Sequence, residues 1–222
     1  MRIIMRMMSA SRASNSNCNS GGPTATGGSI FVYGTLMSPE VMNTLLGPTL
    51  EKSQPVMQPA ILCGYQRFPV KNHVFPGLIP AATTTAAPLT TAVPAETDCI
   101  STTTSIVQGI HVSNLSLPQQ MDILDWFEGD EYTRVQTKVQ LLNDKDNNNA
   151  NDNDSGKNMV SCELYEWSNP VEELELERLE WDYDYFREQH LEWYLENTVR
   201  PCSQELKQRG HYNDNENYKV LE

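Results

Sequence analysis

Glu128 is the residue in this sequence that is best placed to transfer a proton. It ends the stretch PQQMDILDWFE at residues 118–128 and directly follows the apolar side chains of Trp126 and Phe127. Partial burial and the negative end of a helix dipole both disfavour a charged carboxylate, so we expect its pKa to be raised. Such a carboxyl group suits general acid–base catalysis near neutral pH. A solvent-exposed acid at a helix end is the alternative interpretation.

The segment from Tyr33 to Ser38 has the residue types of a binding loop. Residues 30–33 are β-branched or aromatic, which predicts a buried strand that ends at Gly34. Ser38 is followed by a proline and a glutamate, the usual start of a helix. A strand end, a glycine turn and a helix start direct several backbone N–H groups to one point, which favours an anion or a developing oxyanion. An ordinary strand-to-helix connection is the alternative.

The composition argues against several classes of function. The chain has 222 residues and a formal net charge of −13, which argues against nucleic acid or an anionic membrane as a partner. No apolar run approaches the ~20 residues that span a bilayer, so we expect a soluble protein without a transmembrane segment. The five cysteines include no CxxC pair and the four histidines lack metal-ligand spacing, so we predict no metal site.

The chain is predicted to form one domain over residues 30–200. Residues 1–29 are basic and Ser-rich without any acid, as in an organelle transit peptide or a disordered tail. We therefore expect a cytoplasmic protein, or an organellar one if that segment is a transit peptide. Low-complexity insertions are predicted at residues 82–105, rich in Thr and Ala, and at residues 143–158, rich in Asn and Asp. Residues 201–222 are predicted to be a polar C-terminal tail.

Short strands and a few helices must position the candidate residues. Strands are predicted at residues 30–33, 61–65, 74–79, 106–112, 133–142 and 159–167, and helices at residues 39–46, at 118–128, after 168 and after 182. Ser116 and Gln119 have the spacing of a capping box, and Gly129 is placed to end the second helix. This order favours a small mixed barrel with peripheral helices, although the pattern alone does not exclude an open sheet.

Three ordered motifs resemble those of the γ-glutamylcyclotransferase-like family. FVYGTL at residues 31–36 is similar to the opening motif of the family, and FPGLIP at residues 75–80 resembles its second strand motif. LDWFEG at residues 124–129, followed by Tyr132 and Arg134, resembles its catalytic segment. Three motifs in this order make the resemblance specific, whereas YGTL alone would be a weak signal.

A fourth stretch, WDYDYFR at residues 181–187, resembles the AIG2-like branch of this family. The resemblance covers roughly residues 30 to 200, interrupted by the two insertions, and implies an α+β fold with a six-stranded barrel-like mixed sheet. It also implies a reaction in which the α-amino group of an L-γ-glutamyl compound attacks its own γ-carbonyl group. The products are 5-oxoproline and a free amine or amino acid. The implied reaction needs no cofactor and no metal.

The resemblance implies that Glu128 is the general acid and base. Substrate binding would fall to the segment Tyr33, Gly34, Thr35, Leu36, Met37 and Ser38, whose backbone N–H groups would hold the glutamyl carboxylate or the oxyanion. Tyr132 is the further substrate-binding candidate, while Tyr33 could instead be a core tyrosine. Arg134 either pairs with a carboxylate or lies on the outer strand face, and Asp125 is predicted to be exposed helix surface.

Three functions remain open from the sequence. We expect a γ-glutamylcyclotransferase, an acyltransferase-type enzyme that acts on a small γ-glutamyl substrate. The alternative is a non-catalytic AIG2-like module for small-molecule binding or defence response that retains the pocket. A third possibility is an interaction protein that works through its acidic C-terminal helix. The substrate and the oligomeric state are not indicated.

Overall fold

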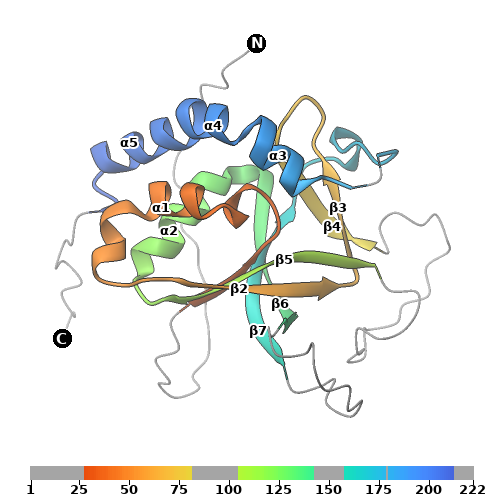
Figure 1. The fold of residues 1–222 in the computed structure, drawn as a ribbon, viewed down its shortest axis with the longest axis horizontal. Coiled ribbons are helices and arrows are strands. Elements are labelled where there is room, and N and C mark those ends of the chain that lie inside the picture. Colours follow the sequence, from red (N-terminus) through yellow and green to blue (C-terminus); the bar gives the residue numbers. More distant parts are fainter. Residues whose placement is uncertain (1–27, 82–104, 143–157, 179, 213–222) are drawn as a thin grey trace.

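A closed barrel of five strands forms the centre of the computed structural model, which describes residues 28–81, 105–142, 158–178 and 180–212 (Figure 1). The order of the strands around the barrel is β1 (Gly28–Val32), β5 (Ile106–Leu115), β2 (Val56–Cys63), β6 (Tyr132–Leu141) and β7 (Met159–Trp167). β1 and β7 pair in parallel and the other pairs are antiparallel, so the sheet is mixed. The predicted α+β class with a barrel-like mixed sheet is confirmed.

The strand count differs from the predicted six. β3 (Tyr65–Pro69) and β4 (Pro76–Pro80) pair with each other in a separate two-stranded sheet beside the barrel. Proline cannot donate to a strand ladder, so the prolines at the ends of these strands suit a short edge hairpin better than a barrel strand. This hairpin carries residues 70–75 in its turn and thereby brings Phe75 and Pro76 to the end of β1.

Close packing inside the barrel requires a glycine at residue 109. Phe31 is fully buried inside the barrel, together with aliphatic side chains from the facing strands. A Cβ atom at Gly109 would lie 2.5 Å from Phe31 Cζ and 2.5 Å from the carbonyl oxygen of Val32. Such contacts are too close for any side chain, so β5 approaches β1 closely only because residue 109 is glycine.

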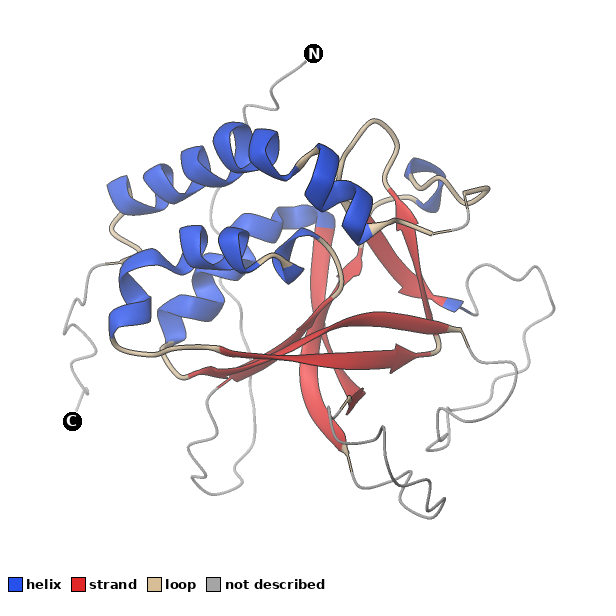
Figure 2. Ribbon diagram, in the orientation of Figure 1, coloured by secondary structure: helices blue, strands red, loops and turns tan. Residues whose placement is uncertain are grey.

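The helices lie together on one side of the barrel (Figure 2). They are α1 (Pro39–Leu46), α2 (Pro118–Glu128), α3 (Tyr183–Gln189), α4 (Leu191–Tyr194) and α5 (Arg200–Gln208), with a π-helical turn at Leu195–Val199 between α4 and α5. A second core, between these helices and the outer face of β1, includes Ile30, Leu45 and Leu124. Two apolar layers therefore hold the ends of β1 and α2 in place.

One of the predicted helix caps is confirmed and another is wrong. The Ser38 side chain accepts from the N–H of Val41 at 3.3 Å, as expected for the cap of α1. The predicted capping box of Ser116 and Gln119 is wrong, because α2 begins one residue later than that pairing requires. The Leu117 N–H donates to the Gln120 side chain at 3.4 Å instead. Gly129, with φ 73°, ends α2 directly after Glu128, as predicted.

The predicted boundary at residue 200 is wrong. α5 extends to Gln208, and the Leu206 side chain is fully buried in the helical core. The Tyr212 hydroxyl donates to the carbonyl of Leu45 at 2.5 Å, which ties the end of this segment to α1. The segment is polar in overall composition, but its apolar residues lie on one face of α5, and this face can pack against the core.

Several predicted segments lie outside the described residues. These are the N-terminal segment up to residue 27, most of the insertion at 82–105 and most of the insertion at 143–158. Residues 28 and 29, placed in the N-terminal segment by sequence, begin β1. In the ranges that the structure describes, no helix has both the length and the apolar character needed to cross a bilayer.

Candidate active site

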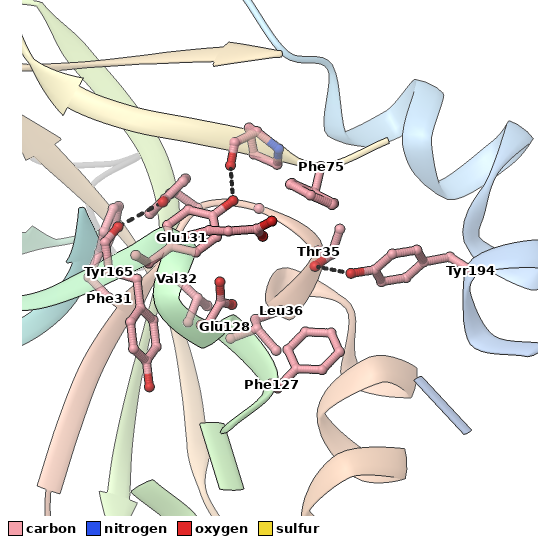
Figure 3. Close-up of a pocket in the computed structure, with 14 residues that line it drawn as sticks. Phe31, Val32, Thr35, Leu36, Phe75, Phe127, Glu128, Glu131, Tyr165 and Tyr194 are labelled. Atoms are coloured by element: carbon pink, nitrogen blue, oxygen red, sulfur yellow. Dashed lines mark hydrogen bonds between the residues drawn. The ribbon is translucent and has the colours of Figure 1, made fainter. Parts of the chain in front are cut away.

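A cavity of about 60 Å³ lies where the end of β1 meets the end of α2 (Figure 3). The hairpin of β3 and β4 and the helix α4 complete its walls. Its lining residues are Phe31, Val32, Tyr33, Gly34, Thr35, Leu36, Phe75, Pro76, Phe127, Glu128, Glu131, Tyr132, Tyr165 and Tyr194. The carboxyl groups of Glu128 and Glu131 are the charged groups of this lining, so the cavity is acidic.

Six of the eight predicted site residues line this cavity: Tyr33, Gly34, Thr35, Leu36, Glu128 and Tyr132. Met37 and Ser38 do not line it, which corrects their assignment. Their N–H groups donate to the carbonyls of Gly34 and Thr35 at 3.0 and 3.1 Å within the turn. The Ser38 side chain is buried at the start of α1. Amide N–H groups that already donate to carbonyls within the turn are not free to bind a substrate.

The first amides of the turn differ from these two. Thr35–Met37 form a short 3-10 helix in which the first backbone donor to a carbonyl is Met37. The N–H groups that precede it have no partner within such a helix. For Gly34, Thr35 and Leu36, no backbone acceptor is found among the described residues. These three amides therefore remain as the hydrogen-bond donors of the loop.

Gly34 is required by close packing against Pro76. A Cβ atom at residue 34 would lie 3.0 Å from both Cδ and Cγ of the Pro76 ring. The proline ring is rigid, so a side chain at this position would separate the loop from the hairpin. The Tyr132 hydroxyl donates to the Pro76 carbonyl at 2.9 Å and so contacts the same hairpin.

Glu128 has the electrostatic character that the sequence predicts. The pKa of its carboxyl group is raised to about 8, chiefly by burial and in addition by the nearby carboxylates of Glu131 and Asp125. Within the described part of the chain, its carboxyl group forms no hydrogen bond or salt bridge that would stabilise the charge. A carboxyl group with a pKa near 8 exists in both protonation states at physiological pH, as proton transfer requires.

Tyr33 and Tyr165 link the cavity to a charged pair on its rim. The Tyr33 hydroxyl donates to the Tyr165 carbonyl at 2.7 Å, and the Tyr165 hydroxyl donates to Asp125 at 2.7 Å. Asp125 also forms a salt bridge of 3.3 Å with Arg134. The Asp125 side chain is 41% exposed, in line with the prediction of helix surface, and Arg134 does pair with a carboxylate.

All four cavity tyrosines have a raised pKa: Tyr33, Tyr132, Tyr165 and Tyr194. Burial is the largest cause, and the negative charge of Glu128 contributes for each of them. Their hydroxyl groups therefore stay neutral around Glu128. Because the hydroxyls of Tyr33, Tyr132 and Tyr165 already donate to fixed acceptors, we interpret these rings chiefly as rigid walls.

Sequence reasoning missed several lining residues. Tyr194 comes from α4, and its ring lies edge-on to Phe127 at 6.4 Å between ring centroids. The Thr35 hydroxyl donates weakly to the Tyr194 hydroxyl at 3.5 Å. Only the folding of the C-terminal segment over the barrel reveals this contact. Glu131, by contrast, lies only three residues after Glu128, in the short 3-10 turn Gly129–Glu131 that follows α2.

A second hollow of about 320 Å³ adjoins the cavity and shares Phe75 and Glu131 with it. The other walls of this hollow are the turn at residues 70–73, Trp167, Glu172 and Glu173. Among the described residues, no group of His, Cys, Asp and Glu side chains is arranged to hold a metal ion.

The chain belongs to the family described as gamma-glutamyl cyclotransferase, AIG2-like, whose model matches residues 30–185, more than half of the sequence. Within this family the chain is similar to the AIG2-like proteins of Arabidopsis thaliana. It is 27% identical to AIG2-like protein D over 175 residues, which cover 79% of this chain and 89% of the relative. It is 26% identical to Protein AIG2 B over 171 residues, which cover 77% of each chain.

Two solved structures are similar to this chain at a lower level. The solution structure of an Arabidopsis thaliana protein has a TM-score of 0.45 and 22% identity, and the match covers 92% of this chain and 93% of that one. The crystal structure of a γ-glutamyl cyclotransferase specific to glutathione from yeast has a TM-score of 0.45 and 15% identity. That match covers 84% of this chain and 97% of the yeast chain.

Proposed function

We propose that this protein is a γ-glutamylcyclotransferase that converts a γ-glutamyl compound to 5-oxoproline, with Glu128 as general base and then general acid. The observation that carries the proposal is the Glu128 carboxyl group itself. It lies in a cavity beside the free amides of the loop after β1, and its pKa is raised to about 8. Family membership supports cyclotransferase-type activity.

The proposed reaction assigns a step to each of these groups. The Glu128 carboxylate takes a proton from the α-ammonium group of the substrate. The freed amine nitrogen attacks the γ-carbonyl carbon, and the new C–N bond closes a five-membered ring. Bond formation leaves the ring nitrogen with one excess proton, which passes to solvent water. Glu128 then returns its proton to the leaving nitrogen as the original amide C–N bond breaks. Both reacting groups belong to one molecule, so holding the right conformer removes much of the entropic barrier.

The loop after β1 supplies the complementary donors. Among the described residues that line the cavity there is no lysine or arginine, and the two carboxyl groups are those of Glu128 and Glu131. A substrate carboxylate or a developing oxyanion must therefore be held by neutral donors. The N–H groups of Gly34, Thr35 and Leu36 are the candidates, and each such donor is typically worth about 10²- to 10³-fold in rate.

The second hollow suits the leaving group. A γ-glutamyl unit bound beside Glu128 would extend past Phe75 and Glu131, the two residues that both spaces share. The leaving amine or amino acid would then occupy the wider hollow.

The proposal is tested by incubating the full-length protein with a panel of γ-glutamyl amino acids, γ-glutamylamines and glutathione and measuring released 5-oxoproline. We expect turnover of at least one member, and we expect Glu128→Gln to lose about 10²-fold or more of that rate. Asp122→Asn is the matched control, because Asp122 is an exposed acid on the same helix. A protein that binds these compounds without consuming any of them would contradict the proposal and favour a non-catalytic binding module.

A further inference from the structure

Arg67 is a buried cation that contacts the loop after β1 without lining the cavity. It lies on β3, is 8% exposed, and does not line the cavity. One terminal nitrogen of its guanidinium group donates to the carbonyl of Tyr33 at 2.7 Å. The other terminal nitrogen donates to Glu180 at 2.5 Å, and the guanidinium carbon lies 5.4 Å from the centre of the Trp181 ring.

The contact with Tyr33 determines the direction of the next amide. The described residues contain no cis peptide bond, so the peptide between Tyr33 and Gly34 is trans. In a planar trans peptide the C=O and N–H groups point in opposite directions. Because the Tyr33 carbonyl points to Arg67, the Gly34 N–H points away from it. Tyr33 and Gly34 both line the cavity, whereas Arg67 lies outside it.

We propose that Arg67 is a positioning residue, which fixes and polarises the Tyr33–Gly34 peptide so that the Gly34 N–H is presented to a negatively charged substrate oxygen. This inference rests on the proposed function for the identity of the substrate. A cation bonded to the carbonyl end of a peptide strengthens the donor at the other end, because linked hydrogen bonds polarise one another. Arg67 would thus bring positive charge to the acidic cavity through the backbone.

The surroundings of Arg67 indicate why arginine is needed there. The planar fork of the guanidinium group reaches the Tyr33 carbonyl and Glu180 at once, which a single lysine ammonium group cannot match in geometry. The Arg67 Nε atom is buried without a hydrogen-bond partner. Burial lowers the pKa of Arg67, and the Glu180 carboxylate opposes that effect. A buried cation with an unpaired N–H donor is poorly explained by a contribution to stability alone.

The experiment compares Arg67→Met, Arg67→Lys and Glu180→Gln in the full-length protein. Glu180→Gln is the matched control, because Glu180 contacts the terminal nitrogen of the guanidinium group that does not bind Tyr33. We expect Arg67→Met to lower kcat/KM for 5-oxoproline release by about tenfold or more, and Glu180→Gln by no more than about threefold. Arg67→Lys, which retains the charge but loses the fork, should fall between them.

A second readout does not depend on turnover. The ¹H–¹⁵N resonance of Gly34 reports the hydrogen bond at the preceding carbonyl, so it should move in Arg67→Met and stay near its wild-type position in Glu180→Gln. If Arg67→Met does not fold, Arg67→Lys replaces it in both measurements. An unmoved Gly34 resonance, or equal kcat/KM in the folded Arg67 and Glu180 variants, would overturn the inference. A moved resonance in a protein without any turnover would instead refute the proposed function.

Discussion

Replacing Glu128 with glutamine should stabilise the protein at high pH and leave its stability almost unchanged at low pH. The pKa of this carboxyl group is about 8 in the folded protein against an ordinary value of 4.5. The folded state therefore binds the proton more tightly than the unfolded state does. Between about pH 4.5 and pH 8, rising pH removes a proton that favours the folded state, so the carboxyl group costs stability above that range.

The size of the effect follows from the same two pKa values. Each pH unit between them corresponds to about 1.4 kcal/mol, which sets an upper limit of about 5 kcal/mol. Glu128 retains partial exposure to solvent, so we expect about 2–3 kcal/mol in practice. In a chain of this size, that free energy corresponds to a rise of about 4–12 °C in Tm.

The assay is urea or thermal unfolding of the wild type, Glu128→Gln and the control Asp122→Asn at pH 5 and pH 9. Glu128→Gln should exceed the wild type in unfolding free energy at pH 9 and match it at pH 5. The control should differ little from the wild type at either pH. A Glu128→Gln protein that is equally or less stable than the wild type at pH 9 would refute the reasoning, because it would mean that the charged carboxylate is not destabilised in the cavity.

Three further perturbations follow from the site and the fold. Glu131→Gln removes one of the carboxylates that raise the pKa of Glu128, so the pH midpoint of kcat/KM should move down by about half a unit to one unit; an unmoved midpoint would count against this coupling. Gly34→Ala places a Cβ atom 3.0 Å from the Pro76 ring, so we expect kcat/KM to fall by about tenfold or more with the fold retained; wild-type activity would show that the loop can shift without consequence. Leu206→Ala removes a fully buried side chain of α5 and should cost about 2–5 kcal/mol in unfolding free energy; an unchanged Tm would restore the prediction of a C-terminal tail.

Local sequence signals predicted the two elements that meet at the cavity. The serine, proline and glutamate before α1 and the apolar run before Gly34 depend on near neighbours in the chain, so their meaning survives without tertiary information. The same holds for Glu128 and Gly129, since a helix end with a left-handed glycine is a local feature. The expectation of a raised pKa at Glu128 also needed only local features, namely its apolar neighbours and its place at the end of a helix.

Long-range contacts account for what the sequence did not reveal. Arg67 is separated from Tyr33 by 34 residues, and Tyr194 from Thr35 by 159 residues, so no local pattern links them. The sequence did not reveal that β3 and β4 pair with each other outside the barrel, because strand pairing is decided by neighbours in space. The error at α5 was avoidable, because Val199 and Leu206 are spaced at two helical turns on one apolar face.

The pH dependence of 5-oxoproline release by the wild type and by Glu128→Gln tests the role of Glu128 most directly. With a γ-glutamyl substrate that the wild type consumes, its kcat/KM should rise with pH through an apparent pKa of about 8. The folded glutamine variant should release about 10²-fold less product and lose that transition. A folded Glu128→Gln protein with the rate and the pH profile of the wild type would contradict the account.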